Sequence, residues 1–189
     1  YWRAPEQTAQ AFDDEGFYCS GDAVKGVDAA FPERGLVFDG RTAEDFKLST
    51  GTFVSVGPLR ARVISAGDPC VQDVVVTGMN RDQIGLLIFP RLDACRAFAG
   101  LDAKAPVAEV LAARAVCEFF QQLVDGLWAS GTGSATRVAR AMVMTEPPSI
   151  DRGEVTDKGS INQRAVLTHR EALVERLYAG HVPDVIVPH

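Results

Sequence analysis

Two charged side chains, each directly after a glycine, are well suited to bind a nucleotide. Asp22 follows Gly21, which lets the backbone turn so that the carboxylate can accept hydrogen bonds from two neighbouring hydroxyls, the geometry that a ribose offers. Arg41 follows Gly40 and supplies a fixed cation with several donors, suited to ribose oxygens or a phosphate. The plainer alternatives are an Asx turn or helix cap for Asp22 and a surface salt bridge for Arg41.

The histidines and cysteines do not have the spacing of a metal site. His169, His181 and His189 lack acidic or cysteine partners at ligand spacing, so we expect them on the surface. The four cysteines, Cys19, Cys70, Cys95 and Cys117, are dispersed and form no CxxC pair. We therefore expect no metal site and reduced thiols in a cytoplasmic protein.

Composition indicates a soluble globular protein of one or two domains. The 189 residues are 47% hydrophobic and 23% charged, enough to bury a sizeable core. A net charge of −6 and the lack of a basic run disfavour nucleic acid as a partner. No apolar run reaches the length of about 18 residues that a membrane span needs, and the N-terminus lacks the pattern of a signal peptide.

The elements that must position these side chains alternate between strands and helices after residue 45. Short runs rich in Val, Ile, Leu and Phe predict strands at 72–77 and 84–89, after a hairpin at 46–54 that turns at Thr50-Gly51. Apolar spacing predicts one long helix over 107–129, and alternation predicts a strand with one partly exposed face over 136–144. Pro58 predicts the start of a helix over 58–66, and Ser160 with Gln163 forms a capping-box pattern for a last helix over 161–179. We expect a loose tail over 183–189 and, for the whole, an α+β fold with a small mixed sheet flanked by helices.

Three motifs occur in the order found in acyl-adenylate-forming enzymes. They are GFYCSGD at 16–22, the Gly40-Arg41 segment and GEVTDKGSINQR at 153–164. The sequence resembles the C-terminal portion of enzymes of this superfamily (AMP-dependent synthetases/ligases, the ANL superfamily). The residues of its motifs are most similar to those of feruloyl-CoA synthetases. The resemblance implies the end of a large nucleotide-binding domain at 1–39, a hinge at 40–45, a mobile lid at 46–180 and a tail at 181–189. The abrupt first residues suggest an excised fragment.

The resemblance also assigns roles to residues. It implies that Lys158 is the catalytic lysine of adenylate formation, and it places the other roles as follows: nucleotide binding at Asp22 and Arg41, the hinge at Ala43 and Glu44, and CoA binding at Gly51, Thr52, Phe53 and Val54. Two positions depart from the family pattern. Ala43 stands where the family usually has Asp or Lys, and Ser160 stands where it has the lysine, which here lies two residues earlier.

The implied reaction has two steps. A carboxylate attacks the α-phosphate of ATP to give acyl-AMP and pyrophosphate, and a thiol then displaces AMP after the lid rotates. The full-length enzyme would use ATP, Mg²⁺ and CoA with an aryl or hydroxycinnamic acid, whereas the fragment encodes no phosphate-binding loop and is expected to be inactive. Two alternatives remain open: a lid that serves loading of a carrier-protein thiol, and a non-catalytic association domain. The sequence does not identify the acid, the thiol acceptor or the oligomeric state.

Overall fold

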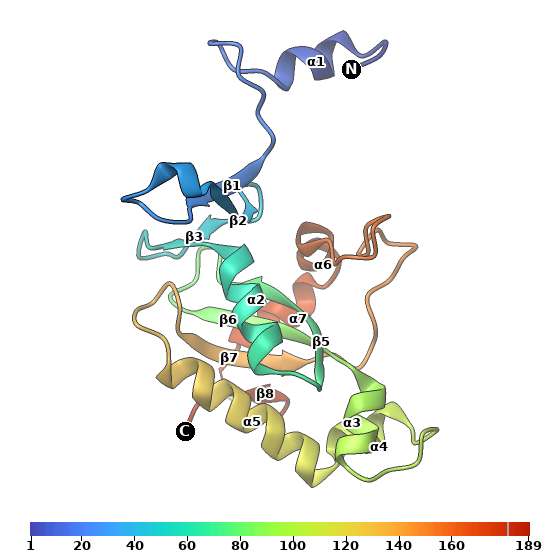
Figure 1. Cartoon of the computed structure of the whole chain (residues 1–189). Coiled ribbons are helices and arrows are strands. Elements are labelled where there is room, and N and C mark those ends of the chain that lie inside the picture. The colour runs from blue at the N-terminus through green and yellow to red at the C-terminus, as the bar shows by residue number, and fades with distance from the viewer. Residues whose placement is uncertain (181) are drawn as a thin grey trace.

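A computed structural model describes residues 1–180 and 182–189 (Figure 1). Within them, a four-stranded sheet forms the centre of the molecule, in the order β5 (Val71–Thr77), β6 (Ile84–Pro90), β7 (Val138–Val143) and β8 (Val185–Ile186). β6 and β7 run parallel, and the two outer pairs are antiparallel. The predicted strands at 72–77, 84–89 and 136–144 are therefore confirmed.

Helices cover both faces of this sheet. α2 (Val56–Ala66) and α5 (Arg114–Ala129) pack on one face with α3 (Leu92–Phe98) and α4 (Val107–Ala112), and α6 (Gln163–His169) and α7 (Glu171–Tyr178) pack on the other (Figure 1). Successive side chains of β5 alternate between the two cores: Val74 and Val76 face the first, and Val75 faces the second. This arrangement confirms the α+β prediction.

β7 differs from its prediction because this second helical layer exists. The alternation of apolar and polar residues predicted one partly exposed face, yet Val138, Ala139, Ala141 and Met142 are all buried. The cover on the second face comes from α6 and α7, which begin twenty positions after the end of β7.

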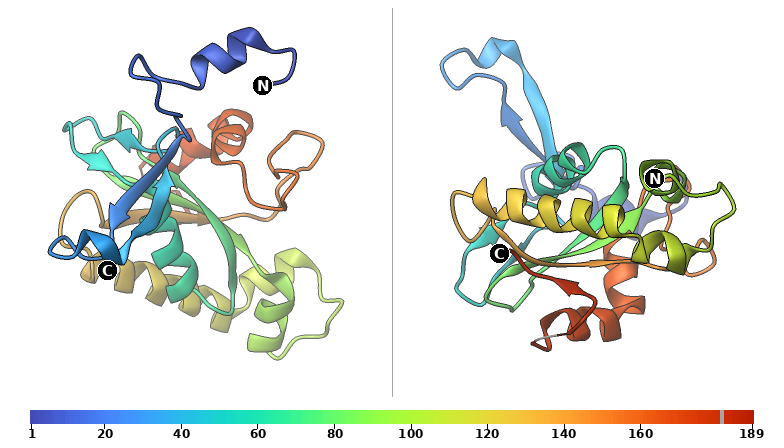
Figure 2. Two further views of the ribbon diagram at one scale, coloured as in Figure 1. Left: turned by 45° about the horizontal axis from the view of Figure 1, so that its top comes forward. Right: turned by 90° about the horizontal axis from the view of Figure 1, so that it is seen from below.

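Two antiparallel hairpins precede the sheet. β1 (Asp22–Gly26) pairs with β2 (Leu36–Arg41), and the short 3₁₀ helix η1 (Pro32–Arg34) lies in their connection. β3 (Phe46–Lys47) pairs with β4 (Phe53–Val54), which confirms the predicted hairpin. The β1–β2 hairpin and α1 (Pro5–Gln10) extend away from the body (Figure 2). No residue of α1 is buried.

The predicted helix over 107–129 is wrong as one continuous element. It is divided into α4 and α5 at Ala113, whose backbone is extended, with φ −61° and ψ 129°. Val110 and Val116 are both fully buried. In one helix these two side chains would be about 600° of rotation apart, and so about 120° apart around the axis, whereas the break lets both face the core.

The predicted last helix over 161–179 is divided as well. It separates at Arg170 into α6 and α7, and it starts later than predicted. Asn162 is the N-cap, because its side-chain oxygen accepts a hydrogen bond from the Ala165 N–H at 3.2 Å, so the capping role predicted for Ser160 is wrong. Gln163 is instead buried, and its Oε1 accepts a hydrogen bond from the N–H of Val76 at 3.1 Å.

Two smaller predictions also need correction. α2 begins at Val56, two residues before Pro58. The tail is not loose, because Val185 and Ile186 pair with β7 and the His189 N–H donates to Asp125 Oδ1 at 2.9 Å. Among the described residues, no helix is both long enough and apolar enough to cross a membrane.

Candidate functional site

A cleft of about 410 Å³ separates the end of β2 and the turn after it from the loop before α6. One wall carries Gly40, Arg41 and Glu44, and α2 forms the floor. The opposite wall carries residues of the C-terminal motif: Thr156, Ser160, Ile161 and Asn162. Two motifs more than a hundred residues apart in the sequence therefore line one cleft.

The β1–β2 hairpin brings the two predicted nucleotide-binding residues together. Asp22 and Arg41 are directly opposite each other in the antiparallel register, and both are exposed. The hydroxyl and the N–H of Thr42 both donate to the carbonyl of Gly21, at 3.0 and 2.9 Å. A carboxylate and a guanidinium thus project from directly opposed positions at one end of a two-stranded ribbon.

The predicted hinge residues form a turn between β2 and β3. The N–H of Glu44 donates to the carbonyl of Arg41 at 3.0 Å, and Ala43 is exposed. Asp45, the last residue of the predicted hinge, accepts a hydrogen bond on Oδ1 from the Val56 N–H at 2.8 Å. This bond satisfies one of the N–H groups that the start of α2 leaves without an intrahelical partner, and it ties the turn to that helix.

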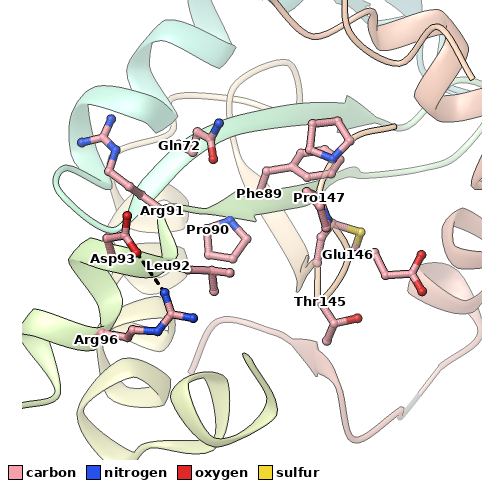
Figure 3. Close-up of a pocket in the computed structure, with 12 residues that line it drawn as sticks. Gln72, Phe89, Pro90, Arg91, Leu92, Asp93, Arg96, Thr145, Glu146 and Pro147 are labelled. Atoms are coloured by element: carbon pink, nitrogen blue, oxygen red, sulfur yellow. Dashed lines mark hydrogen bonds and ion pairs between the residues drawn. The ribbon is translucent and has the colours of Figure 1, made fainter. Parts of the chain in front are cut away.

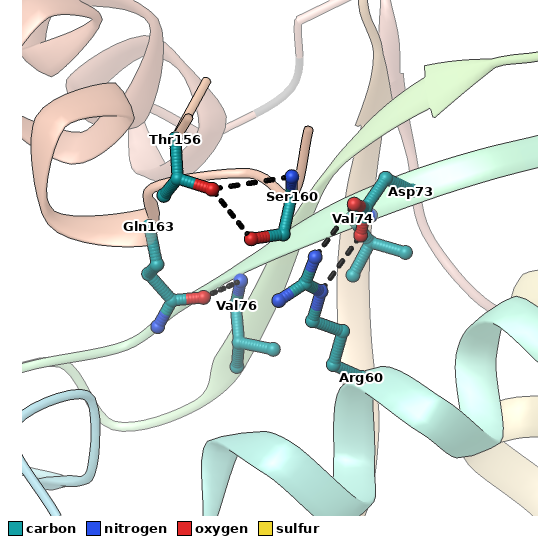
Figure 4. A network of polar contacts seen from close by, with 7 residues as sticks. All are labelled: Arg60, Asp73, Val74, Val76, Thr156, Ser160 and Gln163. Carbon is teal, nitrogen blue, oxygen red and sulfur yellow. Dashed lines mark hydrogen bonds and ion pairs between the residues drawn. The ribbon is translucent and has the colours of Figure 1, made fainter. Parts of the chain in front are cut away.

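The C-terminal motif forms a tight turn with Lys158 at its tip. The N–H of Thr156 donates to the carbonyl of Ser160 at 2.8 Å, and the N–H of Gly159 donates to the carbonyl of Thr156, also at 2.8 Å. Gly159 has φ +79°, a left-handed conformation that favours glycine. The hydroxyls of Thr156 and Ser160 lie 2.8 Å apart (Figure 4). Lys158 is exposed and, within the described chain, makes no ion pair or hydrogen bond through its side chain.

Arg60 is a cleft residue that sequence reasoning missed. It extends from α2 and holds Asp73 of β5 with two parallel hydrogen bonds, Nε to Oδ1 at 2.7 Å and Nη2 to Oδ2 at 2.6 Å (Figure 4). Asp73 keeps the pKa of Arg60 above its usual value. Because the pairing residue lies thirteen positions away, on a different element, no local sequence signal could have identified it.

A buried ion pair lies beneath the C-terminal loop and was also missed. Glu154 is fully buried, and it accepts hydrogen bonds from Arg170, Nε to Oε1 at 3.0 Å and Nη2 to Oε2 at 2.8 Å. The guanidinium lowers the pKa of Glu154 below its ordinary value, against the opposing effect of burial. Arg170 is also the residue at which α6 and α7 separate.

The predicted CoA-binding residues lie in the β3–β4 hairpin and are absent from the lining of the cleft. Gly51 takes φ +81° at the turn, and the hydroxyl of Ser134 donates to that of Thr52 at 3.2 Å. Phe53 is exposed, whereas Val54 is fully buried in the core. In this conformation the hairpin offers a ligand the side chain of Phe53 but not that of Val54.

A second cavity and the histidines are less suited to chemistry. A cavity of about 280 Å³ lies beside the end of β6 and the start of α3, where Arg96 pairs with Asp93 at 2.9 Å (Figure 3). Among the described residues, no group of three or more His, Cys, Asp or Glu side chains could hold a metal ion. His169 and His189 are exposed, as predicted, and His181 lies outside the described residues.

Known proteins are similar to this chain over nearly its whole length. Residues 45–182 match the family described as "AMP-binding enzyme C-terminal domain". The chain is 24% identical over 184 residues to the probable acyl-activating enzyme 16, chloroplastic, of Arabidopsis thaliana, covering 94% of this chain and 25% of that protein. It is 29% identical over 182 residues to the carboxylic acid reductase of Segniliparus rugosus, covering 95% of this chain and 14% of the reductase.

A solved structure agrees in fold. The A domain of the Segniliparus rugosus carboxylic acid reductase, in complex with AMP and a co-purified carboxylic acid, matches with a TM-score of 0.66 and 26% identity. The match covers 95% of this chain and 26% of that one. The chain thus spans a quarter or less of the length of the curated relatives described above.

Proposed function

The chain belongs to the AMP-binding enzyme C-terminal domain family, and from this premise we propose that it is the lid of an ATP-dependent acid–thiol ligase. The parent protein would form an acyl-AMP from a carboxylic acid and ATP and then transfer the acyl group to a thiol. Since the chain spans only part of its relatives, the lid alone would be inactive. The phosphate-binding loop and the acid pocket would belong to the rest of the parent protein.

The cleft that joins the two motifs is the observation that carries this proposal. Arg41 and Glu44 line one wall, and Thr156 and Ser160 line the other. A hinge and a catalytic loop that face one cleft can move together when the lid turns. Asp22 and Arg41, paired across the ribbon, would hold the ribose hydroxyls and a phosphate or ribose oxygen of the nucleotide.

Lys158 is proposed to serve the adenylation step. Its ammonium would hold the carboxylate in place and offset the negative charge that builds up on the α-phosphate oxygens during attack. Ser160 lines the cleft at the position where the family lysine is expected, and Lys158 stands at the tip of the same turn. A two-residue displacement is at most roughly 7 Å of chain, about the length of a lysine side chain, so an unpaired lysine at the tip can reach over it.

The β3–β4 hairpin is proposed to serve the second step. After rotation of the lid, Gly51, Thr52 and Phe53 would line the path of the thiol arm of CoA, while Val54 anchors the hairpin in the core. Ala43 and Glu44 would absorb the change in backbone angles, since a small exposed residue tolerates it. Mg²⁺ would accompany ATP in the cytoplasmic parent enzyme.

For the substrate, we propose a hydroxycinnamic acid such as ferulate, because the C-terminal motif and the hinge segment resemble those of feruloyl-CoA synthetases. A carrier-protein thiol is the alternative acceptor, and a non-catalytic association domain is the alternative outside catalysis. Lys158 is exposed and has no side-chain partner among the described residues, so it can reach a nucleotide, as the catalytic alternative requires.

The test is acid-dependent release of pyrophosphate by the full-length protein with ATP and ferulate, with and without CoA. Release without CoA, and feruloyl-CoA formed when CoA is added, would support the proposal. Release with a fatty acid but not with ferulate would contradict the proposed substrate. Acyl transfer to a carrier protein but not to CoA would contradict the proposed acceptor, and no release with any acid would favour the association domain.

A further inference from the structure

We propose that the buried pair of Glu154 and Arg170 is a positioning device for the loop that carries Lys158, so that adenylate formation depends on it more than acyl transfer does. The inference rests on the proposed function of Lys158. The pair would not touch substrate. It would act by fixing both ends of the loop.

Glu154 ties the two ends of the loop together through its main chain and its side chain. Its N–H donates to the carbonyl of Ser149 at 2.9 Å, and its Oε2 accepts from the Ser149 N–H at 2.7 Å. Its own carbonyl accepts from the N–H of Asn162, the N-cap of α6, at 2.9 Å. One buried residue therefore joins the start of the loop to the start of the helix that follows it.

Arg170 connects Glu154, and with it both ends of the loop, to the body of the lid. Besides Glu154, its guanidinium donates to the carbonyls of Glu146 and Pro147, at 3.1 and 2.7 Å. The same group lies over the ring of Phe89 in β6, 5.0 Å from its centroid. The segment that leaves β7, the loop and the junction of α6 with α7 are thus held against the central sheet.

The tip of the loop has no comparable anchor. Asp157, Lys158 and Gly159 are exposed, and in the described chain the side chains of Asp157 and Lys158 make no hydrogen bond or ion pair. The place of the Lys158 ammonium therefore depends on where the ends of the loop are fixed. A buried pair can often be replaced by apolar residues without loss of stability, so a purely structural role would not require these charges.

The experiment separates the two half-reactions in the full-length protein. The first variant is Glu154→Gln, which removes the carboxylate charge. The second is Arg170→Lys, which keeps the positive charge but cannot form the bidentate pair of hydrogen bonds. Arg176→Gln is the matched control, because it breaks an exposed ion pair between α7 and Asp184, 2.6 Å long, on the same side of the sheet. The readouts are pyrophosphate release with ATP and acid, and thioester formation from supplied acyl-AMP and thiol.

We expect Glu154→Gln and Arg170→Lys to lower kcat of pyrophosphate release by about 10- to 100-fold, because a misplacement of about 1 Å can have that effect. The KM values for ATP and acid and the rate of thioester formation should stay within about threefold, and Arg176→Gln should change neither step. Equal losses in both steps, or no loss in either, would overturn the inference.

Amide hydrogen exchange on the 189-residue chain gives a readout that does not need activity. Glu154→Gln should speed exchange at the N–H groups of Glu154 and Asn162 by about tenfold or more relative to β5 and β6, whose exchange should change only as the free energy of unfolding does. Unchanged exchange in the loop, or equal loss of protection in the sheet, would overturn the inference. A wild-type protein that releases no pyrophosphate would instead contradict the proposed function and the catalytic half of this inference, while exchange still decides whether the pair fixes the loop.

Discussion

Gly40 and Gly57 lie so close together that a β-carbon added to Gly57 would come within 2.6 Å of the α-carbon of Gly40. Gly40 itself has φ +113°, which other residues rarely adopt. The end of β2 therefore rests directly on the first turn of α2, backbone against backbone. This contact is where the predicted hinge meets the predicted lid.

Replacement of Gly57 by alanine should weaken the contact between the end of β2 and the first turn of α2. The new methyl group has only backbone to meet, so we expect a loss of about 1–3 kcal/mol of unfolding free energy, measured by urea denaturation. Gly126→Ala in α5 is the matched control, since a β-carbon there meets nothing within 4 Å and alanine favours the helix by up to about 1 kcal/mol. A Gly57→Ala variant as stable as the wild type would contradict the tight contact.

Native-state alkylation should distinguish two classes of cysteine. Cys19 and Cys117 are exposed, whereas Cys70 and Cys95 are buried, and burial raises the pKa of the Cys95 thiol to about 12. Because the thiolate is the nucleophile, iodoacetamide at pH 8 should modify the first two and spare the others, as mass spectrometry can measure. Unfolded protein, in which all four should react, is the control. Rapid labelling of Cys95 in folded protein would contradict the packing of α3.

The sequence predicted those elements whose signals are local. The apolar runs that became β5 and β6, and the hairpin that turns at Gly51, depend on residues close together in the chain. The breaks at Ala113 and Arg170 have no glycine or proline to mark them. They follow from burial of Val110 with Val116, and of Arg170 with Glu154, which only the assembled fold determines.

The candidate site likewise contains some residues that the sequence could identify and others that it could not. Asp22, Arg41 and Lys158 stood out through motif and residue type, and the register places the first two opposite each other. Arg60 and Glu154 had no such signal, because Asp73 and Arg170 reach them from other elements. Residue types can suggest which groups carry charge to a ligand, but the partners that orient them come from distant strands and helices.

Acidification should remove the stabilising effect of Glu154. Its pKa is lowered in the folded protein, so its contribution is complete above the ordinary glutamate pKa of about 4.3 and is lost as pH falls through the folded pKa. Glu154→Gln should cost about 3–5 kcal/mol of unfolding free energy at pH 7, and this difference from wild type should shrink below about pH 4. Urea denaturation at both pH values measures it.

Glu118→Gln is the control for that series, because it breaks an exposed pair with Arg114 and should cost less than about 1 kcal/mol at pH 7. A Glu154→Gln difference that stays constant down to pH 3 would show that the carboxylate charge does not contribute to folding.

The most direct test of the central claim is pyrophosphate release by the full-length protein carrying Lys158→Ala or Ser160→Ala, with the acid that the wild type activates. If the lysine at the tip of the turn serves adenylation, Lys158→Ala should lower kcat by about 100-fold or more while thioester formation from supplied acyl-AMP continues. Ser160→Ala should stay within about threefold of wild type in both steps. Full adenylation by Lys158→Ala would contradict the claim and remove this lysine from the mechanism.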